Sequence, residues 1–264
     1  MPVIETMDRQ RLYVSEILRG DAYDTFIDAA IMLMDICEEN SVCPSHGLQH
    51  AMAVVRHTEK ALQASGFLAT MSNDEILTVL LAALLHDADD RKLFPKNPVG
   101  AYINARRIME AVNSSLTLRV LQLVKLVSTS ENGNSIPVEA KERPYVLYPR
   151  YADRLEALGE IGIWRCWQFT QTSQRPFFLE TTPRVKTENE LKRVATPERF
   201  EQYQKTGKSE SMMDHFYDKL LHIGHLHSGN SYLEMEAAKR YRQMVTFVLE
   251  FGQTGKLPKI PELT

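Results

Sequence analysis

The stretch EILTVLLAALLHDADDRK, residues 75–92, decides the fold class of this chain. Its first eleven residues are apolar apart from Glu75 and Thr78, and a helix that is apolar nearly all round is buried on every side. The preceding Ser72, together with Glu75, gives the capping-box pattern that starts a helix. The stretch therefore predicts a buried helix that opens near residue 73 and ends at His86 and Asp87.

Helical periodicity dominates the rest of the sequence as well. Apolar residues recur every three or four positions, and no segment alternates as a strand would. On this pattern we expect helices at about 22–39, 48–65, 101–112, 116–127, 151–169, 187–205, 211–226 and 230–252. Proline and glycine predict a long loop over residues 128–149. The sequence thus predicts an all-α fold, with one domain over residues 1–264.

Composition sets broad limits on function. The chain has 264 residues, of which 44% are hydrophobic and 25% charged, as in soluble globular proteins. Its net charge of −3 gives no basic footprint for nucleic acid. Cys37, Cys43 and Cys166 show no CxxC spacing, which fits a reducing compartment. With no apolar secretory segment at the start and no apolar run of about 18 residues, we expect a cytoplasmic protein without a membrane partner.

Three groups of polar residues can carry chemistry. His86 and Asp87 leave an apolar helix together, so they need hydrogen bonds or a metal, although a histidine interacting with the helix dipole is an alternative. His46 and His50 stand four apart, a metal-ligand spacing that is also common by chance. Asp153 lies in the first turn of an expected helix, either as an acid that complements the dipole or as a carboxylate that faces a metal.

Taken together, these residues resemble the HD-domain superfamily of metal-dependent phosphohydrolases. The resemblance rests on SHGLQHAMAVVRH (45–57), LLAALLHDADDRK (80–92) and YADRLEALGEIGI (151–163). HFYDKLL, residues 215–221, is similar to a further block of a bacterial branch that has a C-terminal helical extension. The resemblance implies an HD-type helical bundle with a core at about 25–170, added helices at about 187–252 and a loose tail over 253–264.

By position, the resemblance implies that His50, His86, Asp87 and Asp153 are metal ligands. The implied cofactor is one divalent transition metal ion, Mn, Fe, Co, Ni or Zn, since the ligands are mixed nitrogen and oxygen donors. His46 would lie at the rim of the site, near phosphate or a metal-bound water. Branch members usually carry Asp after that first histidine, where this chain has Gly47.

Charged residues next to this set are candidates for catalysis and substrate binding. Asp89 and Asp90 follow the HD pair and are candidates to orient or deprotonate a water, with Asp90 favoured by the resemblance; a solvated acidic turn is the alternative. Arg91, Lys92 and Lys219 are candidate phosphate contacts, or else solvated surface charges. His215 lies four residues before Lys219, on the same expected helix face, and joins the candidate substrate contacts. His222, His225 and His227 are expected to be surface histidines that interact with the end of a helix, and a second metal site is the alternative.

The function implied is a metal-dependent phosphohydrolase. Its partner would be a small phosphorylated molecule, a phosphate ester or anhydride of nucleotide-like character, attacked by a metal-activated water. One alternative is a di-iron oxygenase of the same superfamily, but such a site needs further histidines, and none occurs between Asp87 and Asp214. A non-catalytic helical binding module is another alternative, against which the complete H, HD and D set argues.

Overall fold

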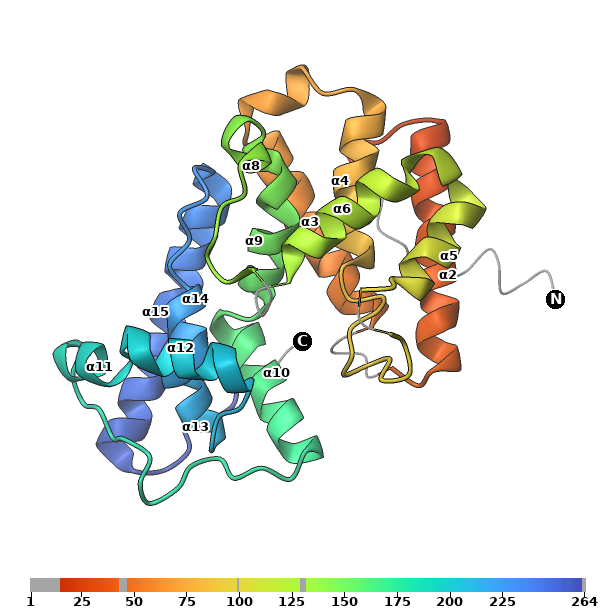
Figure 1. The fold of residues 1–264 in the computed structure, drawn as a ribbon. Helices are drawn as coiled ribbons and strands as arrows, with labels where there is room; N and C mark the ends of the chain where they lie inside the picture. Colours follow the sequence, from red (N-terminus) through yellow and green to blue (C-terminus); the bar gives the residue numbers. More distant parts are fainter. Residues whose placement is uncertain (1–14, 43–46, 99, 129–131, 263–264) are drawn as a thin grey trace. The chain divides into compact units, whose positions relative to one another are not determined.

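In a computed structural model of the chain, residues 15–42, 47–98, 100–128 and 132–262 are described (Figure 1). Within this part of the chain the regular elements are helices and no β-strand forms, which confirms the predicted all-α fold. The residues cluster into two compact units, Met1–Asp153 and Arg154–Thr264. The single-domain organisation expected from the sequence stays a prediction.

The first unit is built around the apolar helix. Its α-helices are α2 (Asp21–Glu39), α3 (Leu48–Gln63), α4 (Asn73–Leu85), α5 (Ile103–Val112), α6 (Thr117–Val127), α8 (Glu139–Glu142) and most of α9 (Tyr148–Glu156). Short 3₁₀ turns lie at Gly66–Ala69, Ser114–Leu116 and Pro144–Leu147. Helix α4 packs against α2, α3 and α6, so it forms the centre of this unit (Figure 1).

Helix α4 behaves as its sequence predicts. Every residue from Ile76 to Leu85 is buried. The Ser72 hydroxyl accepts a hydrogen bond from the Glu75 amide at 3.3 Å, and the Glu75 carboxylate accepts one from the Ser72 amide at 2.9 Å. The predicted capping box is therefore confirmed, and it fixes where the helix begins.

Two expected helices are each broken in two. The helix expected over 151–169 is split, because α9 ends at Glu156 and α10 (Gly159–Thr172) starts anew. Gly159 has φ of +66°, and a Cβ there would lie 2.9 Å from the Cβ atom of Arg240, so this break favours glycine. The helix expected over 187–205 becomes α11 (Glu188–Val194) and α12 (Pro197–Thr206). Thr196 is extended because a residue before proline avoids the helical region.

The second unit completes the helical set with α13 (Met212–His215), a π-helical turn at Phe216–Leu220, α14 (Leu221–Ile223) and α15 (Ser231–Thr254). Helix α15 packs against α10 and α14, and α12 packs against the π-helical turn.

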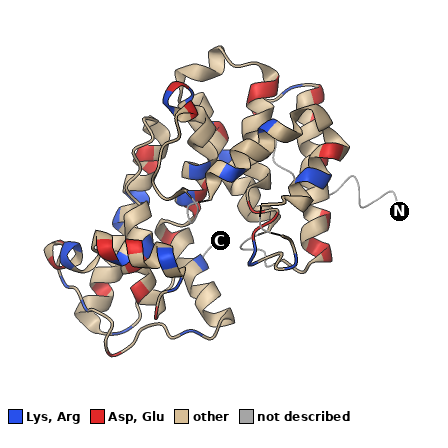
Figure 2. Cartoon of the chain, viewed as in Figure 1, with Lys and Arg blue, Asp and Glu red and all other residues tan. Residues whose placement is uncertain are grey.

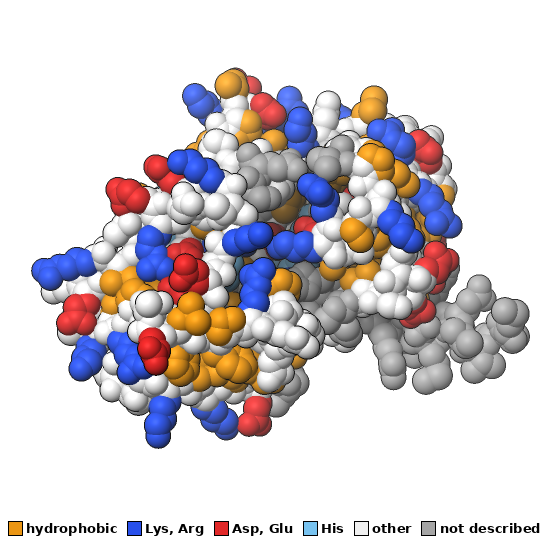
Figure 3. Space-filling model, turned by 60° about the horizontal axis from the view of Figure 1, so that its bottom comes forward, with side chains coloured by type: hydrophobic (Ala, Val, Ile, Leu, Met, Phe, Trp, Pro, Cys, Tyr) orange, Lys and Arg blue, Asp and Glu red, His pale blue; other side chains and the backbone are white. Residues whose placement is uncertain are grey.

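Charged and apolar side chains are interspersed over both units. Acidic and basic residues are distributed over the helices of both units, in keeping with the small net charge (Figure 2). The exposed large apolar side chains of the described residues come from several segments of the chain: Ile103, Leu118, Ile136, Val138, Phe169 and Met235. On the face drawn in Figure 3, charged and polar side chains lie among the apolar ones. In the described part of the chain, no helix combines the length and apolar character that crossing a membrane requires.

Candidate metal centre

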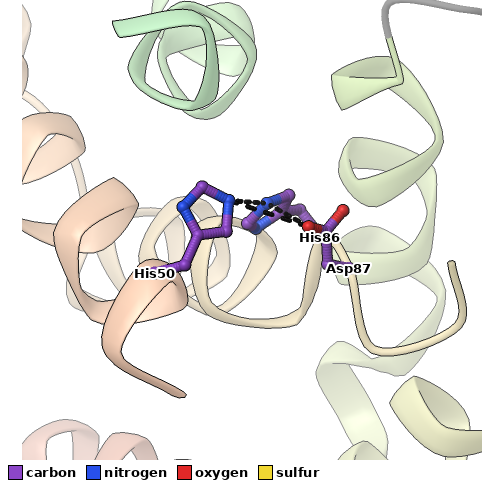
Figure 4. A group of neighbouring side chains, drawn as sticks. All are labelled: His50, His86 and Asp87. Carbon is purple, nitrogen blue, oxygen red and sulfur yellow. Dashed lines mark hydrogen bonds and ion pairs between the residues drawn. The ribbon is translucent and has the colours of Figure 1, made fainter. Parts of the chain in front are cut away.

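Two histidines and an aspartate converge at one end of α4. The Nε2 atoms of His50 and His86 are 3.2 Å apart. Asp87 Oδ2 lies 3.3 Å from the Nε2 atom of His86 and 3.7 Å from that of His50. All these ligand atoms lie within 4.8 Å of one another, and Figure 4 shows the side chains pointing to a common position.

Asp153 adds a second carboxylate to this group. Its Oδ1 atom lies 3.4 Å from His50 Nε2 and 3.7 Å from His86 Nε2. The structure therefore brings together the four residues that the resemblance implies as ligands, from α3, the end of α4 and α9. That they bind a metal stays a proposal.

Helix ends position the two histidines. His50 lies in the first turn of α3, after Gly47 at the N-cap, and only 5% of the residue is exposed. His86 caps the end of α4, where the buried run stops. The apolar body of α4 thus holds the polar pair His86 and Asp87 at the edge of the core.

The ring orientation of His86 is set by a backbone contact. Its Nδ1 atom lies 2.8 Å from the carbonyl oxygen of Ala83, so this nitrogen carries the proton and donates. In the neutral ring, the Nε2 atom then has a free lone pair directed at the group. This is the arrangement in which a metal-binding histidine is oriented by a second hydrogen bond.

The electrostatics of the group favour a positive charge. Burial alone would lower the pKa of His86, but Asp87 and Asp153 raise it to about 9. Burial alone would raise the pKa of Asp153, but the hydrogen bond from His50 and the charge of His86 lower it. A proton on His86 therefore offsets part of the negative charge of the two carboxylates when no other cation does.

A divalent ion fits the same position. With metal–nitrogen bonds of about 2.1 Å, two imidazole nitrogens on one ion lie roughly 3.0–3.4 Å apart, and the two Nε2 atoms here are 3.2 Å apart. Two imidazoles and two carboxylates give a charge of −2, which one divalent ion neutralises. Mixed donors of this kind suit Mn, Fe, Co, Ni or Zn.

The two acids after the HD pair have different surroundings. The Asp89 carboxylate accepts hydrogen bonds from the side chain of Asn97 at 2.8 Å and from the amides of Asn104 and Ala105 at 2.9 and 3.0 Å. Asp89 thus holds the start of α5 against the loop before it. Its oxygens are engaged in this structural role, which the sequence did not indicate.

Asp90 is partly buried, and its carboxylate accepts a hydrogen bond from the Lys92 amide at 2.7 Å. Burial and the neighbouring Asp87 raise the pKa of Asp90. The side chains of Arg91 and Lys92 are exposed. His46 lies outside the described residues.

The other predicted substrate contacts lie in the second unit, around an aromatic ring. The ring of His215 meets Tyr203 edge-on at 5.2 Å, and its Nδ1 atom lies 3.2 Å from Ser209 Oγ. Lys219 Nζ is 5.5 Å from the centre of the Tyr203 ring. The structure therefore brings His215 and Lys219 together around Tyr203, a residue that the sequence reasoning missed. Its signal was an aromatic pair, Phe200 and Tyr203, on an otherwise polar helix.

The remaining histidines of the second unit have separate environments. His225 and His227 are exposed. His222 stacks on Phe200 at 5.1 Å, and its Nε2 atom contacts the Tyr217 carbonyl at 2.9 Å. Only the first unit brings three or more possible ligand residues together, as far as the described residues go.

No protein-family model matches the chain. The uncharacterized protein L803 of Acanthamoeba polyphaga mimivirus is 37% identical over 223 residues, which cover 78% of this chain and 88% of that protein. A protein of Lactobacillus plantarum has a similar structure, with a TM-score of 0.61 and 20% identity over 87% of this chain and 96% of its own.

Two further solved structures are similar to this chain in fold. An HD-superfamily hydrolase of Bacillus thuringiensis has a TM-score of 0.57 and 21% identity over 87% of this chain and 96% of its own. YpgQ of Bacillus subtilis in complex with ADP has a TM-score of 0.54 and 17% identity over 91% of this chain and 99% of its own. The chain therefore belongs to one family with the mimivirus protein L803, and its fold is similar to that of an HD-superfamily hydrolase.

Proposed function

We propose that this chain is a metal-dependent phosphohydrolase that cleaves a phosphate ester or anhydride of a nucleotide-like molecule. The observation that carries the proposal is the convergence of two imidazole nitrogens, 3.2 Å apart, and two carboxylates, each of which has an oxygen 3.3–3.7 Å from both nitrogens. His50, His86, Asp87 and Asp153 would hold one divalent ion. Such an ion, when bound, lowers the pKa of a coordinated water and polarises a phosphoryl oxygen.

Asp90 is the acid that we assign to the attacking water. It follows Asp87 by three residues, and its carboxylate has one backbone donor, whereas Asp89 is engaged by three donors. A general base must lie within hydrogen-bond reach of the proton that it takes. Asp90 would orient the water and accept its proton without binding the ion.

In the first unit, the exposed side chains of Arg91 and Lys92, which directly follow the acid pair, would contact anionic groups of the substrate. In the second unit, the half-buried His215 and Lys219, which lie around Tyr203, are proposed as substrate contacts. The similarity in fold to an HD-superfamily hydrolase and to YpgQ with ADP supports a phosphorylated, nucleotide-like substrate.

The test is a phosphate-release screen over nucleoside mono-, di- and triphosphates. Protein stripped with EDTA should be inactive, and reloading with Mn²⁺ should restore release from at least one nucleotide class. Asp153→Asn should stay inactive after reloading, because it removes the charge of a ligand. His227→Ala, which changes an exposed histidine of the second unit, should behave as the wild type. Release that survives EDTA, or that Asp153→Asn retains in full, would rule the proposal out.

A further inference from the structure

Arg150 is the largest of the fully buried side chains in the described residues, with 1% of the residue exposed. It lies on α9, three residues before Asp153, so the two side chains share one side of that helix. Burying a guanidinium group is unfavourable unless its N–H groups and its charge are compensated. The hydrogen bonds that compensate the buried guanidinium group therefore show which segments Arg150 connects.

Two backbone carbonyls accept hydrogen bonds from Arg150. Its Nε atom donates to Leu126 O at 2.6 Å, and its Nη1 atom donates to Ser135 O at 2.7 Å. Leu126 lies in the last turn of α6, where carbonyls lack partners within the helix and where the helix dipole favours a positive charge. Arg150 thus caps the end of α6 and ties it both to α9 and to the segment that follows α6.

This link connects the two sides of the candidate metal centre. Helix α6 packs against α4, whose end carries His86 and Asp87. Helix α6 also packs against the 3₁₀ turn Pro144–Leu147, which leads directly into α9. A bridge from α9 to the end of α6 therefore sets where Asp153 lies relative to the HD pair.

We infer that Arg150 is a positioning residue, which holds the Asp153 carboxylate in register with His50, His86 and Asp87 through its bonds to Leu126 and Ser135. The inference rests on the proposed function, since it takes Asp153 as a metal ligand. Functional groups need to be held within about 0.5 Å of their working geometry. Residues that orient ligands typically change metal affinity by about 10- to 100-fold when they are replaced.

The experiment is a double-mutant cycle read out by Co²⁺ binding, which reports both the affinity and, through the visible spectrum, the ligand geometry. Arg150→Met should weaken Co²⁺ binding by about 10- to 100-fold and alter the spectrum of the bound ion. Arg150→Gln, which keeps one donor group for a carbonyl, should give a smaller loss and serves if the Met variant does not fold. In an Asp153→Asn background, Arg150→Met should change the affinity by less than about threefold, because the ligand that it positions is already altered.

Val124→Ala is the matched control. Val124 is a buried residue of α6, with 4% exposed, so its truncation loosens the packing without removing the carbonyl bridge. It should lower Tm and leave the Co²⁺ spectrum unchanged. The inference would be overturned, and the proposed function left standing, by either of two results. One is a folded Arg150 variant with wild-type Co²⁺ affinity. The other is an Arg150→Met change that lowers the Co²⁺ affinity equally in the wild-type and Asp153→Asn backgrounds. A wild-type chain that binds no Co²⁺ would overturn the proposed function, and this inference with it.

Discussion

Asp89 and Asp90 are adjacent acids with different surroundings. The resemblance favours Asp90 as the acid next to the water, but the sequence gives no structural role for Asp89, because neighbouring positions in a turn look alike. Asp89 reaches Asn104 and Ala105, 15 and 16 positions further along the chain, and that partnership exists only in the folded structure.

We expect the two amide variants to separate these roles. Asp90→Asn should keep the metal and most of the substrate affinity, while kcat falls by roughly two orders of magnitude or more, as for loss of a general base. Asp89→Asn should lower stability by about 1–3 kcal/mol, because an amide cannot accept all three hydrogen bonds. Metal content, kcat, KM and Tm would be measured for both variants in parallel. A wild-type kcat in Asp90→Asn would remove that residue from the reaction.

At the scale of elements, local sequence patterns predicted the start, the buried face and the end of a single helix. The capping box and the buried body of α4 follow from residues 72–85 alone, and so does the position of His86 at the helix end. The breaks after Glu156 and Val194 were missed, because an apolar periodicity continues across them while Gly159 and Pro197 redirect the backbone.

Links between distant elements had no signal in the sequence. Glu59 on α3 is 1% exposed, and its Oε1 atom accepts hydrogen bonds from Ser15 Oγ at 2.8 Å and from the amides of Glu16 and Ile17 at 2.7 and 3.0 Å. This carboxylate thus fastens the segment before α2 to α3. A glutamate in the polar part of a helix pattern gives no indication that it is buried.

The Glu59 link predicts a pH dependence of stability. Burial raises the pKa of Glu59, although the amides of Glu16 and Ile17 oppose the shift. A carboxyl whose pKa is higher in the folded state stabilises the fold most at low pH, and it loses that contribution as the pH rises through the raised pKa. Glu59→Gln cannot ionise and keeps an oxygen for the same donors. Its Tm relative to the wild type should therefore rise between about pH 4 and about pH 8.

Thermal unfolding of both proteins across this range measures the effect. Glu110→Gln, which changes an exposed glutamate of α5, is the control and should show no such trend. The Tm of Glu59→Gln minus that of the wild type is the quantity compared. If it stays constant or falls as the pH rises, burial does not raise the pKa of Glu59.

At the scale of the whole molecule, the fold class and the four proposed ligands could be predicted, and the arrangement that supports them could not. His50, His86, Asp87 and Asp153 stand in motifs that carry a recognisable pattern. The roles inferred for Arg150 and Tyr203 depend on contacts that exist only in the folded chain. Arg150 contacts Leu126 and Ser135, and Tyr203 contacts His215. Such contacts join residues 12 to 24 positions apart.

The central claim is that one divalent ion is held by these four residues, and metal analysis of purified protein tests it most directly. The wild type and His227→Ala should each bind about one transition metal ion per chain, because only one group of three or more possible ligands occurs among the described residues. His86→Ala and Asp87→Ala should bind well below one, since each removes a ligand. Full metal occupancy in both of these variants would contradict the account.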